Sequence, residues 1–218
     1  MTPDDDCPAA ALPLLSVDLE TTGLSREKDR VLAIGWVPVT GDRIELAGAR
    51  RLVVQHDDPG AAVAIHGLTH DDLAVGLDLR EALRLLDCAL IGRALLAHHA
   101  PMDVGFLEAA HRSVGEVAPV VPVVCTLQLE RRLLSRHHEE LPSGSLRLWR
   151  ARSRRGLPVV RAHDALGDAL AAAELYLVQV AELEARGGAV TLGDLRLRET
   201  WWRRLRLRLD RRLSDGSR

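Results

Sequence analysis

The first chemistry that the sequence suggests is cation binding by two neighbouring carboxylates. Asp18 and Glu20 lie two residues apart at the end of an apolar run, residues 14–18, which is typical of a buried strand. Side chains of a strand alternate between its faces with a period of two, so both carboxylates point to the same side. Two such charges beside apolar residues repel each other and lose hydration unless a cation binds them. The alternative is that acidic residues merely end the strand.

Three residues further along the chain are candidates for the same site. Asp103 begins a helix expected over residues 101–111, directly after an apolar run, residues 93–98, that indicates a strand. His163 and Asp168 lie five residues apart near the start of a long Ala-rich helix. Considered singly, Asp103 could be an acid that the helix dipole favours, and the other two could be a solvated surface pair. Their order on compatible elements favours one shared site.

The elements that must position these residues alternate between strands and helices. Strands are expected at residues 14–18, 30–40, 43–55, 93–98 and 120–126. Helices are expected at residues 79–91, 101–111, 127–136, 145–155 and 163–186. This order predicts an α/β fold with a mixed five-stranded sheet and helices on both faces.

The motifs around the candidate residues resemble those of the DEDD superfamily of 3'-5' exonucleases. Residues 17–24 (VDLETTGL), 97–107 (AHHAPMDVGFL) and 163–169 (HDALGDA) are similar to its three motifs. The five-residue step from His163 to Asp168 matches the histidine subclass, DEDDh. Residues 65–69 (IHGLT) resemble a stretch of relatives of the proofreading epsilon subunit of bacterial DNA polymerase III. The resemblance covers residues 12–185 and implies a ribonuclease H-like fold.

The resemblance also implies an activity and a set of catalytic residues. Two divalent cations, Mg²⁺ or Mn²⁺, would be held by Asp18, Glu20, Asp103 and Asp168, with Asp103 acting partly through water. His163 would be the general base, because its reference pKa of about 6.5 suits proton transfer at neutral pH. The expected reaction is hydrolysis from the 3' end of single-stranded DNA or frayed ends, releasing nucleoside monophosphates.

Two alternatives to that reaction stay open at this point. The first is a 3'-5' exoribonuclease that acts on short RNA or RNA 3' ends, although DNA is favoured over RNA. The second is an accessory subunit whose main task is to dock onto a polymerase.

The resemblance further predicts which residues contact the terminal nucleotide. These substrate-binding candidates are Thr21, Thr22, Gly23, Leu24, His66, His98 and Phe106. For Phe106, packing in the core is the competing interpretation, since helical spacing alone explains an apolar residue there. Three neighbouring positions depart from the family pattern, with His99, Met102 and Cys125 where relatives commonly have Asn, Phe and Asp. None of the three removes an expected metal ligand or the base.

The charge is distributed unevenly, and this distribution divides the chain. The formal net charge is -2, but residues 1–140 carry 13 basic and 22 acidic side chains, and residues 141–218 carry 16 and 9. We expect a polar leader at residues 1–11, an exonuclease domain at residues 12–188 and a basic amphipathic extension at residues 189–218. A helix over residues 191–213 would place leucines on one face and arginines elsewhere, although residues 205–209 also alternate as a strand would.

That extension has three possible uses. We rank docking first, either to a protein partner or a second copy through residues 191–213 or within the chain itself, contact with nucleic acid second and an anionic membrane surface last. The chain shows no apolar run of the ~20 residues needed to span a bilayer, and its first residues do not resemble a signal peptide. Its three cysteines form no CxxC pair. A cytoplasmic protein without integral membrane association is therefore expected.

Overall fold

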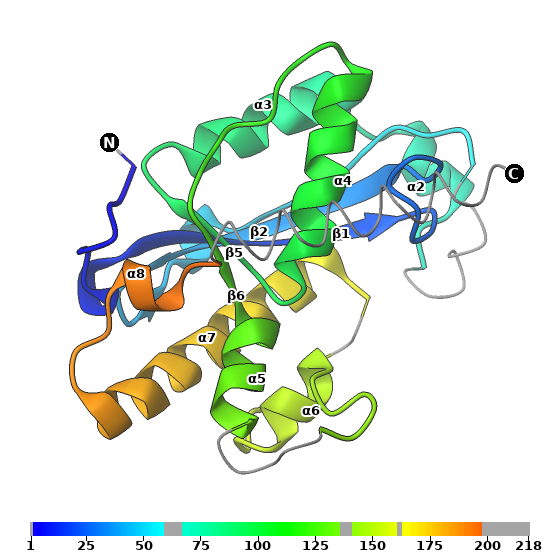
Figure 1. Ribbon diagram of the computed structural model, residues 1–218. Coiled ribbons are helices and arrows are strands. Elements are labelled where there is room, and N and C mark those ends of the chain that lie inside the picture. The colour runs from blue at the N-terminus through cyan, green and yellow to red at the C-terminus, as the bar shows by residue number, and fades with distance from the viewer. Residues whose placement is uncertain (1, 59–66, 136–140, 161–162, 198–218) are drawn as a thin grey trace, which may run out of the picture.

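The strands form one sheet in the computed structural model, which describes residues 2–58, 67–135, 141–160 and 163–197 (Figure 1). The strands are β1 (Pro13–Thr21), β2 (Val31–Thr40), β3 (Arg43–Ile44), β4 (Arg50–Val53), β5 (Ala94–Ala97) and β6 (Val123–Cys125). Their order is β3-β2-β1-β5-β6, with β4 also paired to β2. β1 and β2 are antiparallel, whereas β1, β5 and β6 run parallel. The mixed α/β sheet predicted from the sequence is thus confirmed.

Helices cover both faces of this sheet. The α-helices are α2 (His70–Ala74), α3 (Leu79–Leu90), α4 (Ala100–Ser113), α5 (Thr126–Leu134), α6 (Leu148–Ser153), α7 (Ala165–Gly187) and α8 (Leu192–Leu195). Short 3₁₀ helices occur at η1 (Ala9–Ala11) and η2 (Leu46–Gly48). In Figure 1, α3 and α4 lie above the sheet, and α5, α6 and α7 lie below it. No helix of the described ranges is long and apolar enough to cross a membrane.

The period of two along β1 divides the core into two layers. Leu14 packs in the layer between the sheet and α7, and Leu15 packs in the opposite layer with α3 and α4. Ser16 faces α7, where its hydroxyl donates a 2.7 Å hydrogen bond to the carbonyl of Ala169. Because alternate residues share a face, Asp18 and Glu20 also point toward the α7 side.

The prediction of one continuous strand at residues 43–55 is wrong, because this segment forms two strands, β3 and β4. Ile44 pairs with Val39 and Arg50 pairs with Trp36, so the residues between them lie opposite Pro38. Pro38 accepts a 2.9 Å hydrogen bond from the N–H of Glu45 but has no N–H to donate in return. The ladder is interrupted there, η2 forms, and the sheet has six strands rather than the five expected.

Two expected helices also differ from the structure. The helix predicted at residues 145–155 is shorter and comprises only α6. The helix predicted at residues 191–213 begins as α8 but ends at Leu195, because Arg196 has an extended backbone and pairs with Val124 of the edge strand β6. Residues 198–213, with most of the proposed partner surface, lie outside the described residues.

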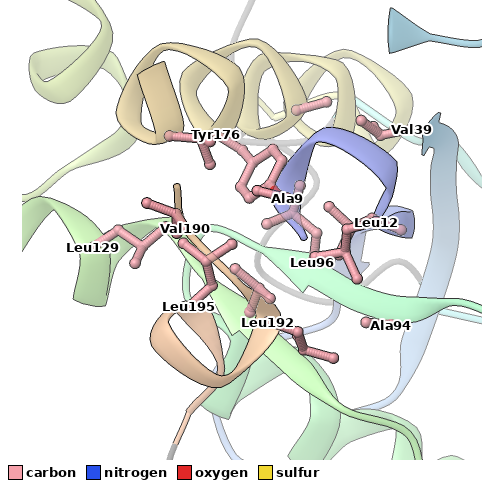
Figure 2. Close-up of a cluster of buried hydrophobic side chains, with 14 of the residues drawn as sticks. Ala9, Leu12, Val39, Ala94, Leu96, Leu129, Tyr176, Val190, Leu192 and Leu195 are labelled. Carbon is pink, nitrogen blue, oxygen red and sulfur yellow. The ribbon is translucent and has the colours of Figure 1, made fainter. Parts of the chain in front are cut away.

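The segments next to the expected domain contribute to its core. Figure 2 shows side chains of one hydrophobic cluster that come from both ends of the described chain and from α7, among them Ala9, Leu12, Tyr176, Val190, Leu192 and Leu195. The N–H of Ala9 donates to the carbonyl of Val190 at 2.8 Å. The division at residues 11 and 188 stays a prediction, but residues on both sides of each boundary pack together.

Candidate active site

Three of the predicted metal ligands converge at the end of β1. Carboxylate oxygens of Asp18, Glu20 and Asp168 all lie within 4.8 Å of one another. Asp18 and Glu20 come from the α7-facing side of β1, and Asp168 comes from the first turn of α7. Glu20 is buried, and the other two are half-buried. Hard divalent cations prefer such oxygen ligands, so the cluster suits Mg²⁺ or Mn²⁺.

Gly35 lets α7 approach the sheet closely enough for Asp168 to reach β1. Gly35 lies directly opposite Asp18 in the β1–β2 register. A Cβ atom at this position would lie 2.1 Å from the carbonyl carbon of Ala165, at the start of α7. Gly35 is not among the site residues predicted from the sequence, although a glycine inside a strand often marks close backbone approach.

The start of α7 is held by its cap and by an ion pair. The Asp164 carboxylate accepts a 2.9 Å hydrogen bond from the N–H of Gly167, which caps the helix. Arg51 of β4 pairs with the same carboxylate at 2.9 Å. His163 precedes the cap with φ of 64°, in the left-handed region, and its N–H donates a 2.8 Å hydrogen bond to Asp168 Oδ2. The backbone of His163, the predicted base, is therefore tied to the carboxylate of Asp168, a predicted metal ligand.

The electrostatics of the cluster favour a bound cation. Burial, followed by the neighbouring carboxylates, raises the pKa of Asp18 well above its ordinary value. Burial and the charges of Asp168 and Asp164 likewise raise the pKa of Glu20 to about 7, against a smaller opposing effect of Arg51. Burial also raises the pKa of Asp168. Positive charge placed between these groups would relieve the repulsion and favour their ionised forms.

Asp103 lies beside the cluster but outside the tight group of three. It is 7% exposed in the first turn of α4, and its charge contributes to the raised pKa of Asp18. Burial raises the pKa of Asp103 to about 7, although hydrogen bonds from its own backbone N–H and that of Leu19 act in the opposite direction. The bond from Leu19 ties the start of α4 to β1.

A cleft of about 1530 Å³ opens onto this cluster. Its lining includes Asp18, Glu20, Asp103, His163 and Asp168. Among the predicted substrate contacts, it also includes Thr21, Gly23, Leu24, His98 and Phe106. Leu24 is 79% exposed and so is free to contact a ligand. The last of the predicted contacts, His66, lies outside the described residues.

Thr22 does not line the cleft, and its contacts indicate a different task. Its hydroxyl donates to the carboxylate of Asp29 and accepts from the N–H of Arg30, each at 3.0 Å. A Cβ at Gly23 would lie 2.5 Å from that same Asp29 carboxylate. Thr22 and Gly23 therefore shape the loop that presents Leu24.

His98 and Phe106 line the cleft mainly as packed residues. His98 Nδ1 lies 2.8 Å from the Thr126 hydroxyl and Nε2 lies 2.9 Å from the Leu146 carbonyl. Burial lowers the pKa of His98 to about 4, so the ring is neutral at physiological pH, with Nε2 donating to the carbonyl. Phe106 is 2% exposed in the α3–α4 layer. His98 thus joins α5 to the segment that precedes α6.

The far wall of the cleft carries residues that the sequence did not distinguish individually. Arg131 comes from α5, Arg147 and Trp149 come from the start of α6, and Val159 follows that helix. All four are exposed. The sequence around Arg147 and Trp149 shows only a basic segment, residues 145–155, which could contact phosphates but is explained at least as well by a solvated face or a docking surface.

Comparisons to known proteins point to an exonuclease family. Residues 15–176 match the RNase_T family model, which is described as "Exonuclease". The chain is also 31% identical over 205 residues to a Mycobacterium tuberculosis protein whose name describes a bifunctional exonuclease/endonuclease. That alignment covers 89% of this chain but only 30% of the relative's length.

A second relative and a solved structure are also similar to this chain. DNA polymerase III subunit epsilon of Haemophilus influenzae is 28% identical over 188 residues, which is 82% of this chain and 69% of that protein. The crystallographic structure of the nuclease domain of 3'hExo, a DEDDh family member bound to rAMP, has a TM-score of 0.69 at 14% identity. It covers 88% of this chain and 98% of the other. This structural similarity identifies the ribonuclease H-like exonuclease fold, as expected.

Proposed function

The chain belongs to the RNase_T exonuclease family, and on that premise we propose that it removes nucleoside monophosphates from the 3' end of single-stranded DNA or frayed ends. The observation that carries the proposal is the convergence of Asp18, Glu20 and Asp168 within 4.8 Å in a cleft that His163 also lines. Such a cleft can admit a flexible strand and expose its terminal phosphodiester to the carboxylates.

The donor set fits two divalent cations. Asp18, Glu20 and Asp168 would supply direct ligands, and Asp103 would act partly through water. The raised pKa values support this assignment, because buried carboxylates that repel each other need a compensating charge. When bound, the cations would stabilise negative charge on the attacking and leaving oxygens.

We assign the role of proton acceptor to His163. It is exposed to the cleft, and its backbone is fixed by the hydrogen bond to Asp168. In the proposed reaction the His163 ring takes a proton from the attacking water as the new bond to phosphorus forms. The bond from phosphorus to the 3' oxygen of the preceding nucleotide breaks, that oxygen takes up a proton from solvent water, and His163 later returns its own proton to solvent. The products are a nucleoside 5'-monophosphate and a strand with a new 3' hydroxyl.

The relatives support DNA and RNA to different degrees. The Haemophilus influenzae relative is named as a DNA polymerase III subunit, which favours DNA. The 3'hExo domain binds rAMP, which keeps RNA 3' ends as the second candidate. A single reaction containing DNA and RNA oligomers of one sequence, each with a different fluorescent label, distinguishes them. We expect the DNA oligomer to be shortened first, and faster loss of RNA would reverse the order.

The main test uses the purified 218-residue chain and a 5'-labelled single-stranded DNA. With Mg²⁺ or Mn²⁺, gel analysis should show a ladder that shortens from the 3' end, and EDTA should stop the reaction. Asp18→Asn should abolish shortening. Asp42→Asn is the matched control, since Asp42 is an exposed acid whose only ion pair among the described residues is with neighbouring Arg43. Full activity of Asp18→Asn would contradict the proposed metal site.

A further inference from the structure

We propose that Trp149 of α6 is a stacking platform for a nucleobase upstream of the terminal nucleotide. The proposal rests on the function proposed above and adds a binding subsite on the wall of the cleft that carries α6. Trp149 would stack on the flat face of a base in a single strand, whatever the identity of that base.

The exposure of Trp149 is unusual for its residue type and is located in the cleft. Trp36, by comparison, is 4% exposed within the core, whereas Trp149 is 56% exposed. Tryptophan is the largest apolar side chain, and leaving it in water forgoes a substantial hydrophobic gain unless a ligand covers it. Trp149 lines the same continuous cleft as Asp18 and His163, so a strand that reaches the carboxylates passes along this cavity.

The indole is attached to a helix that is firmly anchored. Next to it, Ala151 and Arg152 are buried, and Arg152 donates a 2.7 Å hydrogen bond to the carbonyl of Ala171 in α7. Arg152 also forms a 2.7 Å ion pair with Glu174 of α7. The guanidinium of Arg150 lies 4.9 Å from the centre of the Trp149 ring. A ring held in this way is already positioned for a partner and loses little freedom on binding.

The residues around Trp149 match the alternating chemistry of a nucleic-acid strand. Val159 is fully exposed in the same cleft, and Leu24 is exposed beside the carboxylates, so apolar surfaces are available for bases. Arg131 and Arg147 also line the cleft, and neither takes part in an ion pair within the described ranges. Apolar platforms interspersed with free cations are what sequence-tolerant binding of single strands requires.

The inference predicts that Trp149 matters only for substrates with an upstream base. An oligomer of about eight nucleotides would reach α6, because single-strand sites of this kind span about 4–16 nucleotides. The p-nitrophenyl ester of thymidine 5'-monophosphate has no upstream base and would occupy only the region of the carboxylates. Comparison of the two substrates therefore separates the platform from the catalytic residues.

The first experiment measures kcat/KM of Trp149→Ala on both substrates. We expect a loss of about tenfold on the oligomer, mostly through KM, and no change on the ester. Trp149→Phe should keep most of the oligomer activity, because its ring can still stack. Val120→Ala is the control, since Val120 is 96% exposed but does not line the cleft. Unchanged oligomer cleavage by Trp149→Ala, or an equal loss on the ester, would overturn the inference.

A second experiment does not depend on activity. Anisotropy of a fluorescein-labelled oligomer, measured in EDTA with the 218-residue chain, should give a Kd about tenfold higher for Trp149→Ala than for the unchanged chain. An equal Kd would count against the platform even if the protein cleaves DNA. If the unchanged chain cleaves neither substrate but binds in a Trp149-dependent way, the proposed activity fails and the subsite stands.

Discussion

The backbone N–H of His163 donates a 2.8 Å hydrogen bond to Oδ2 of Asp168, so the proposed base is joined through its main chain to a proposed metal ligand. This bond forms while His163 has φ of 64°. A left-handed conformation costs most side chains about 1–2 kcal/mol, but asparagine adopts it readily. Position 163 therefore combines a chemical role with a conformational one, and two substitutions separate these roles.

Both His163→Asn and His163→Ala should lower kcat by about 10²- to 10⁴-fold, because each removes the proton acceptor. Only His163→Ala should also lower the melting temperature, since alanine is the poorer residue for a positive φ. Single-turnover cleavage and thermal unfolding in EDTA provide the two measurements. Retention of near-normal cleavage by His163→Asn would show that another group takes the proton.

The raised carboxyl pKa values predict how the stability of the metal-free protein depends on pH. In the unfolded chain these groups ionise near pH ~4, whereas folded Glu20 and Asp103 have a pKa of about 7. The folded state binds more protons between these values, so this contribution to stability is lost as pH rises from about 5 to 8. His98, with its pKa lowered to about 4, has the opposite effect at the acidic end.

Comparing the unchanged protein with Asp18→Asn at each pH cancels the contribution of His98, because both proteins contain it. In EDTA at pH 8, Asp18→Asn should melt about 2–4 °C above the unchanged protein, because it relieves repulsion worth about 1 kcal/mol. This difference in melting temperature should decrease toward pH 5, where the carboxyl groups are protonated. Mn²⁺ or Mg²⁺ should raise the melting temperature of the unchanged protein more than that of the variant. A difference that grows on acidification would contradict the assigned pKa directions.

Gly35→Ala should damage both stability and activity. The new methyl group would lie 2.1 Å from the Ala165 backbone, so α7 must move away from β2 and take Asp168 with it. Such overpacking typically costs about 1–3 kcal/mol. Urea unfolding and exonuclease assays with added Mn²⁺ would measure the two effects.

Gly187→Ala is the matched control for this substitution. Gly187 is the last residue of α7, and an added Cβ there would meet no atom within 4 Å. Helix propensity predicts unchanged or slightly higher stability. If the two glycine variants behaved alike, close packing at Gly35 would not be what positions α7.

Glu130 should be far more important for stability than an exposed glutamate. It is fully buried, and it pairs with Arg154 and Arg155, each at 2.7 Å. Burial acts to raise the pKa of Glu130, but hydrogen bonds from Arg155, Arg154 and Gln179 outweigh burial and lower it. Glu130→Ala would remove the ion-pair partner of Arg154 and leave Arg155 paired with Glu182 alone, so it should destabilise the protein by about 3 kcal/mol, measured by urea unfolding.

The control for Glu130 is Glu81→Ala. Glu81 pairs with Arg84 one helical turn away on α3, and both side chains are well exposed. Removing an exposed pair should change the urea midpoint very little. Equal effects of the two variants would mean that the buried network contributes nothing beyond a surface pair. A selective loss of oligomer over ester cleavage by Glu130→Ala would further indicate that the network positions α6.

Those parts of the fold and site that depend on local pattern could be predicted from the sequence. The period of two put Asp18 and Glu20 on one face, and the five-residue step placed His163 and Asp168 together. The structure brings Asp18, Glu20 and Asp168 within 4.8 Å, while their catalytic roles stay predictions.

Features that depend on contacts between distant segments could not be predicted in the same way. Gly35 matters because of Ala165, 130 positions later, and nothing near Gly35 reveals that contact. The break in the strand at residues 43–55 follows from Pro38 on the neighbouring strand. Trp149 is a site candidate only because the chain folds α6 over the same cleft as β1.

The two ends of the described chain contact each other directly, and this affects how the domain could be connected to others. Asp5 and Arg196 form a 2.8 Å ion pair, and Gly193 donates a 2.9 Å hydrogen bond to the Asp5 carbonyl. The first and last described segments therefore lie close together, near Asp5 and Arg196. Such a unit can be inserted into a loop of a longer protein without separating the parts that flank it.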